Sequence, residues 1–171
     1  MRSRTSTWFE TKVRYEKTQD DGTLKKQTEQ YVVDALSFTE AESTIMQEMS
    51  AYVSGEMEIR DIRLASYGEI FFSDAPNDDK WYKAKLQFIT IDEKTEKEKR
   101  SNVTYLVQAG NLPMAVKHID EVMGGTMIDY VMAAIQETQI MDVFEHNSTN
   151  GKKNEEVNDV PEYEQKEIKE E

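Results

Sequence analysis

The stretch TWFETKVRY (Thr7–Tyr15) decides the fold, because KWYKAKLQF (Lys80–Phe88) repeats its pattern 73 residues later. Both stretches alternate polar and apolar side chains with the period of two that is typical of a strand with one buried face. The correspondence continues downstream, where YVVDALSFTEA (Tyr31–Ala41) matches YLVQAGNLPMA (Tyr105–Ala115). Similar residues in the same order over this length predict an internal duplication.

Each copy is predicted to be a β-β-α-β unit. The capping-box sequence SFTE (Ser37–Glu40) predicts the start of the first helix, and Asn111 followed by Pro113 predicts the start of the second. The two units predict an α+β fold with two helices, in which the strands form one antiparallel sheet or two packed sheets. The predicted strands are Thr7–Glu16, Tyr31–Ala35 and Met57–Phe72 in the first copy, and Trp81–Ile91, Tyr105–Ala109 and Ile128–Phe144 in the second.

The chain therefore divides into three segments. Residues 1–73 form the first copy and residues 74–145 form the second, joined at the polar segment SDAPNDD, which we expect to be a linker. Residues 146–171 contain eight acidic and four basic residues and almost no apolar ones. Because such a segment cannot offset the entropy lost on ordering, we expect a disordered acidic C-terminal tail.

The composition excludes several classes of protein. The 171 residues contain no cysteine, so disulfides and thiolate chemistry are excluded and an intracellular location is favoured. No apolar run is long enough to cross a bilayer, and the opening MRSRTSTWFE lacks the apolar stretch of a signal peptide. The net charge of −13 opposes non-specific attachment to nucleic acid or anionic lipid. We therefore expect a cytoplasmic protein with no membrane partner.

The alternation in the repeated strand separates two faces. Phe9 and Val13 belong to a face that should lie in the core, whereas Trp8, Lys12 and Arg14 belong to the opposite face, which should be solvated. The second copy repeats this combination of a tryptophan with cations. Aromatic rings can stack on bases while cations neutralise phosphates. The predicted nucleic-acid-binding residues are Trp8, Lys12, Arg14, Trp81, Lys83, Lys85, Lys97 and Arg100.

This pattern predicts binding of single-stranded DNA or RNA. The charge distribution agrees, because residues 80–109 have seven basic and four acidic residues, whereas residues 37–73 have two basic and seven acidic ones. The acidic tail would then be a regulatory arm that competes with nucleic acid or binds a protein partner.

Other interpretations remain open. Tryptophans at the starts of strands commonly anchor a core, and the two copies could pack through them. The same face could instead meet a protein or a second copy, in a protein-interaction or oligomeric assembly module without nucleic-acid binding. We expect no catalysis, cofactor or metal: His118 should lie on the surface of the second helix and His146 in the tail, and neither has a partner at ligand spacing.

Several long stretches resemble a known family. They are RTSTWFETKVRYEK, TEQYVVDALSFTEAE, LQFITIDEKTEKEKRSNV and VMGGTMIDYVM, and they resemble the DUF4494 family of small bacterial and bacteriophage proteins, a domain of unknown function. The resemblance covers Met1–Glu145 and excludes the tail. It implies no catalytic residues. The occurrence of such domains beside phage replication genes implies an accessory role in replication or recombination through single-strand binding.

Overall fold

The computed structural model describes residues 1–146, so the predicted disordered tail lies outside the described residues except for His146. This part of the chain contains nine strands and two helices, and the strands form two sheets. This arrangement confirms the α+β class. The four-stranded sheet has the order β4 (Met57–Leu64), β2 (Trp8–Thr18), β3 (Leu24–Asp34), β9 (Ile140–Phe144). The five-stranded sheet has the order β1 (Arg2–Thr5), β5 (Glu69–Phe72), β7 (Glu98–Ala109), β6 (Lys80–Ile91), β8 (Asp129–Glu137).

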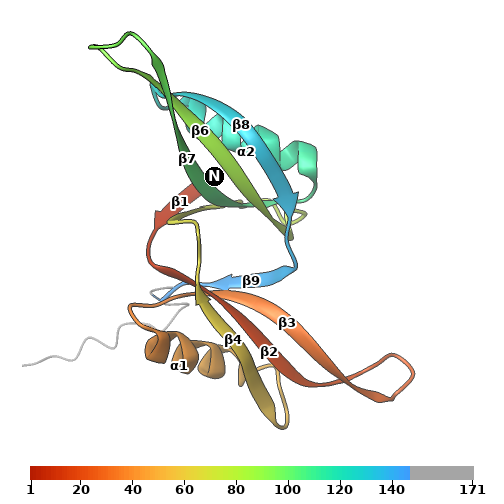
Figure 1. The fold of residues 1–171 in the computed structure, drawn as a ribbon. Helices are drawn as coiled ribbons and strands as arrows, with labels where there is room; N and C mark the ends of the chain where they lie inside the picture. The colour runs from red at the N-terminus through yellow and green to blue at the C-terminus, as the bar shows by residue number, and fades with distance from the viewer. Residues whose placement is uncertain (147–171) are drawn as a thin grey trace, which may run out of the picture.

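The two halves of the chain have the same topology and complete each other's sheets. The order β4-β2-β3 in the first half corresponds to β8-β6-β7 in the second. The last strand of the first half, β5, pairs in parallel with β7, and the last strand of the second half, β9, pairs in parallel with β3. The predicted long strands Met57–Phe72 and Ile128–Phe144 are thus each two strands, because the chain crosses between the sheets (Figure 1). The duplication itself stays a prediction.

The helices begin where the capping residues predict. The Ser37 hydroxyl accepts a hydrogen bond from the Glu40 backbone N–H at the start of α1 (Phe38–Met49). The Asn111 side chain accepts one from the Met114 backbone N–H at the start of α2 (Leu112–Gly124). These contacts satisfy backbone donors that have no partner within the helix. Neither helix in residues 1–146 has the length and apolar character needed to span a membrane.

The core follows the layers of the fold. Helix α1 covers one face of the four-stranded sheet through Ala41, Ile45 and Met49, and α2 covers one face of the five-stranded sheet in the same way. Between the uncovered faces lies a central core that contains residues of both sheets. Its buried members are Trp8, Val32, Tyr67, Ile70, Phe72, Trp81, Leu106, Ile140 and Val143.

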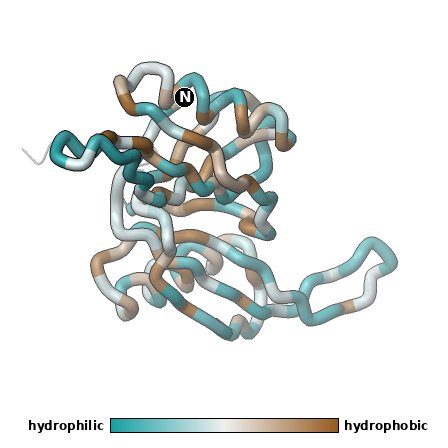
Figure 2. Tube along the Cα trace, turned by 45° about the horizontal axis from the view of Figure 1, so that its top comes forward, coloured by the Kyte–Doolittle hydropathy of each residue, from teal (hydrophilic) through white to brown (hydrophobic). Residues whose placement is uncertain are grey.

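The β2–β3 and β6–β7 hairpins extend beyond their sheets. Strand β4 pairs with β2 no farther than Tyr15, and β9 pairs with β3 only from Gln30 onward. The outer part of this hairpin is therefore a two-stranded ribbon, as is the outer part of β6–β7. The two ribbons project in different directions from the centre of the molecule (Figure 1). The β2–β3 ribbon, at lower right in both views, is largely hydrophilic (Figure 2).

Candidate functional site

Both tryptophans lie in the central core, which corrects the prediction that they face solvent. Trp8 is 1% exposed and Trp81 is 2% exposed. The Phe72 ring lies between them, with its centroid 6.4 Å from that of Trp8 and 5.6 Å from that of Trp81. The Trp8 indole N–H donates to the Gly68 carbonyl oxygen at 3.2 Å. Alternation along a strand separates two faces but cannot show that a second sheet covers the polar one. Neither ring can stack on a base in this structure.

The predicted cations continue along the same strand faces, farther from the central core. Lys12, Arg14 and Lys85 form no ion pair or side-chain hydrogen bond with any residue that the structure describes, and the same holds for Lys97 in the β6–β7 turn. The other two have partners. Lys83 pairs with Glu10, and Arg100 contacts Glu98 and Gln87. The structure thus leaves four of the six predicted cations unpaired.

The two ribbons are electrically balanced. Residues 16–26 contain three acidic and three basic side chains, and residues 92–100 contain four of each. A protein that binds phosphates along a backbone needs a local excess of positive charge. The ribbons do not supply this excess, so an electrostatic contact with nucleic acid would depend on the unpaired cations of the sheet faces.

The outer strands β4 and β8 occupy equivalent positions and differ sharply in charge. Strand β4, MEIRDIRL, has four charged residues, Glu58, Arg60, Asp61 and Arg63. Strand β8, DYVMAAIQE, has charges only at its two ends. Within residues 1–146 each strand has one neighbour, β2 or β6, and so presents a free edge (Figure 1). Along β8 the side chains of Val131, Ala133 and Ala134 are exposed.

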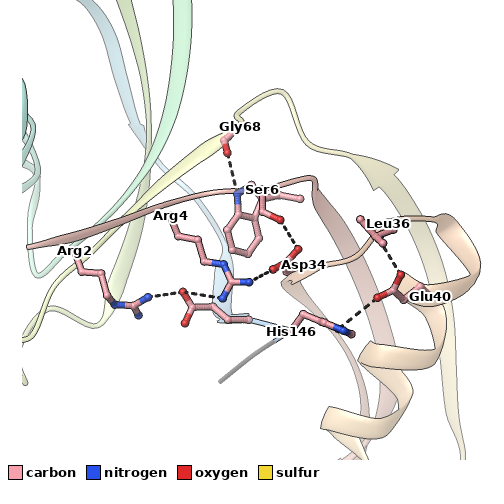
Figure 3. A network of polar contacts seen from close by, with 10 residues as sticks. Arg2, Arg4, Ser6, Asp34, Leu36, Glu40, Gly68 and His146 are labelled. Carbon is pink, nitrogen blue, oxygen red and sulfur yellow. Dashed lines mark hydrogen bonds and ion pairs between the residues drawn. The ribbon is translucent and has the colours of Figure 1, made fainter. Parts of the chain in front are cut away.

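A polar network joins the N-terminal strand to the end of β9 (Figure 3). The Arg4 guanidinium lies 2.5 Å from the buried Asp34 carboxylate, which also accepts a hydrogen bond from the Ser6 hydroxyl. Arg2 pairs with Glu145 at 2.6 Å. Because the Asp34 carboxylate is buried, loss of its Arg4 partner would leave an uncompensated charge where the two sheets meet.

Comparison with known proteins places the chain in a family. Residues 7–146 match the model described as Domain of unknown function (DUF4494). The chain belongs to this family. No curated protein and no solved structure matches it. The matched region contains every strand that the structure describes in residues 1–146 except β1, which precedes it.

The DUF4494 domain also contains a buried polar cluster that the sequence did not predict. His118 and Asp78 are each 6% exposed, so the prediction that His118 lies on the surface is wrong. His118 Nδ1 lies 3.0 Å from the Gln108 carbonyl oxygen, and Nε2 lies 3.6 Å from the Asp78 carboxylate. Because a carbonyl only accepts, Nδ1 carries a proton. Asp78 and His118 are forty residues apart in the chain, so no sequence motif links them.

The order of contacts in this cluster argues for a structural role. Asp78 accepts a hydrogen bond from the Ser73 hydroxyl, so the carboxylate lies between the serine and the histidine. A nucleophilic serine needs the histidine beside its hydroxyl to remove the proton. This cluster instead fastens the linker of residues 73–79 to α2 and β7.

A hollow beside the β2–β3 ribbon offers no clear ligand preference. It has a volume of about 640 Å³ and lies where β2 continues past the start of β4, below the segment Val53–Glu56. Its wall combines Arg14 and Lys26 with Glu16, Glu56 and Glu58. Among residues 1–146 no group of three or more His, Asp or Glu side chains could hold a metal ion.

Proposed function

We propose that the protein is a non-catalytic protein-interaction module, which accepts an extended strand of another protein along the free edge of β8. The observation that carries this proposal is the nine-residue edge strand with no charge between Asp129 and Glu137. The backbone N–H and C=O groups along such an edge can pair with a further strand, and this is a recurrent mode of peptide recognition.

The contrast with β4 supports the choice of edge. Proteins commonly protect free sheet edges with charged side chains, which oppose pairing with another strand. Strand β4 has this protection at four of its eight positions, and β8 has none in its interior. In the middle of β8 the exposed side chains, Val131, Ala133 and Ala134, are small, so an added strand could approach this part without displacing a long side chain.

A bulge divides the free edge of β8 into two parts. The β6–β8 register shifts between Lys85 and Leu86, where Ala133 is the extra residue of β8. Bulges interrupt the regular row of backbone groups at an edge. We therefore expect the added strand to pair with β8 in two short runs, one on each side of Ala133.

The test uses a soluble nine-residue peptide of alternating Thr and Val as the probe and follows backbone hydrogen exchange of the whole protein. The peptide should slow exchange of β8 amides, and a version with methylated backbone nitrogens should not. Val131→Lys should weaken binding, because it places a charge on the edge. Leu64→Lys is the matched control, since both residues are exposed apolar positions on outer strands, 40% and 60% exposed respectively. Equal protection by the methylated peptide would refute strand addition.

The unpaired cations favour a second candidate, binding of single-stranded nucleic acid through phosphates alone. Lys85 is exposed and Lys12 and Arg14 are half-buried, and none of the three has a carboxylate in hydrogen-bond contact within residues 1–146. Affinity would then fall steeply with rising salt. In this proposal the acidic tail is a regulatory arm, and the protein acts in the cytoplasm.

A labelled oligonucleotide tests the second candidate. The full chain and a chain ending at His146 are titrated at low salt, and Lys12→Gln and Lys85→Gln should each weaken binding. Lys117→Gln, on the exposed side of α2, is the control and should bind as the wild type does. Absence of binding by both chain lengths at low salt would remove this candidate.

A further inference from the structure

The edge of β8 is bordered by negative charge. Asp129 and Glu137 lie at its two ends, and Asp120 of α2 accepts a hydrogen bond from the Tyr130 hydroxyl at 2.6 Å. The Glu137 Oε1 atom lies 3.4 Å from Lys80 Nζ, and an exposed ion pair of this kind contributes little free energy in water. Asp129 has no ion-pair partner among residues 1–146. A strand that docks here therefore meets a carboxylate near each of its ends.

This charge pattern disfavours two occupants that the chain itself could supply. Two copies of β8 paired antiparallel in a centred register would set Asp129 of one against Glu137 of the other, and like charges directly opposite destabilise a sheet. The C-terminal segment 147–171 has eight acidic and four basic residues, so it would bring further negative charge to the same edge. The occupant that fits comes from a different protein.

The two faces of β8 define the middle of the docking strand. Tyr130, Met132 and Ile135 lie half-buried on the side covered by α2, and they continue the core beneath that helix. Val131 and Ala134 lie on the opposite, solvated face. An added strand alternates in the same way, so an apolar side chain at every second position would extend the core under α2.

We infer that the partner of β8 is an extended segment with uncharged, β-prone residues in the middle and Lys or Arg near both ends. This inference rests on the proposed function, because it specifies the strand that the β8 edge receives. Charges at the rim of an interface steer the choice of partner and contribute modestly to affinity. The charges at the two ends of the docking strand thus select the partner. The backbone hydrogen bonds supply the affinity that all docking strands share.

The test compares nine-residue peptides with the same Thr/Val core, ended by Lys on both sides or by Glu on both sides. Fluorescence anisotropy with the full chain should show the Lys-ended peptide binding roughly fivefold to tenfold more tightly at low salt. The preference should shrink as salt screens the exposed charges. The double variant Asp129→Asn/Glu137→Gln should lose the preference. The matched control Glu42→Gln/Glu93→Gln removes two exposed charges elsewhere and should keep it.

The outcomes separate this inference from the proposed function. If both peptides bind equally and both protect β8 amides from exchange, strand addition stands and the charge inference is wrong. If neither peptide binds below about 1 mM, or if backbone methylation leaves binding unchanged, strand addition at β8 is wrong and the inference falls with it. Tighter binding of the Glu-ended peptide would overturn the charge inference directly.

Discussion

Lys83 Nζ lies 3.2 Å from Glu10 Oε1, and the two residues hold equivalent positions, 73 residues apart, in the repeated strand. Glu10 belongs to β2 and Lys83 to β6, so the ion pair joins the two sheets beside the buried tryptophans. The same lysine lies 5.6 Å from the centre of the Tyr67 ring. Burial, together with the nearby Glu10 carboxylate, raises the pKa of Tyr67 above its ordinary value. The two strands of similar sequence thus differ at this position, Glu in β2 and Lys in β6, and the two side chains form an ion pair between the sheets.

We predict that reversing one charge of this pair costs stability and that exchanging both restores it. Glu10→Lys and Lys83→Glu should each lower the free energy of unfolding by about 1 kcal/mol, because each places like charges together at a partly exposed site. The double variant should recover most of the loss. Urea unfolding of the four proteins measures the coupling. Strictly additive losses would show that the pair contributes nothing.

The burial of the tryptophans predicts their spectroscopy and their contribution to stability. Native emission should be blue-shifted and poorly quenched by acrylamide, and both properties should disappear on unfolding. Trp81→Ala should lower the free energy of unfolding by about 3–5 kcal/mol, because it leaves a large cavity between the sheets. Tyr52→Ala, at a side chain that is 74% exposed, is the control and should have a small effect. Efficient quenching of the folded protein would contradict the packing.

Gly110 should tolerate no side chain. A Cβ there would lie 2.7 Å from the Asn77 carbonyl oxygen, in the backbone of the linker that Asp78 fastens. Gly110→Ala should therefore lower the free energy of unfolding by about 1–3 kcal/mol. Gly68→Ala is the matched control, since a Cβ at that position meets nothing within 4 Å. Equal melting temperatures for the two variants would show that the linker moves freely.

The protein should lose stability at alkaline pH through Tyr15. Burial first, and then its hydrogen bond to Glu29, raise the pKa of Tyr15 from 10.0 to about 12. A group with a raised folded pKa contributes stability below its unfolded pKa, and this contribution is lost as the pH rises through the folded value. The stability advantage of the wild type over Tyr15→Phe should thus shrink between pH 10 and 12. An advantage that stays constant over this range, in denaturant titrations, would contradict the prediction.

Much of the secondary structure follows from local pattern. The Ser37 and Asn111 caps, the alternation of the first strands and the apolar faces of both helices each depend on neighbours in sequence. The segment YVMAAIQET, most of which forms β8, has residues that suit a helix by propensity. Comparison with the first copy predicted the strand correctly. The sequence similarity between the two halves thus predicts this strand, which propensity alone does not.

The candidate site was less predictable, because it depends on how the sheets meet. The tryptophan faces looked solvated within one copy, and only the other copy buries them. The crossing of β5 and β9 into the opposite sheets likewise leaves no local pattern. His118 gave no signal for the same reason, since its partner Asp78 lies in the linker before β6.

The reciprocal placement of β5 and β9 has a consequence for synthesis and for proteolysis. The outer side of β3 stays without its neighbour until the ribosome has reached Phe144, roughly 4 to 14 seconds after the end of the first half at ordinary elongation rates. Neither half can complete its sheet before the other half has been synthesised. A protease that nicks the chain between Asp74 and Asp79 would leave two fragments still interlocked through each other's terminal strands.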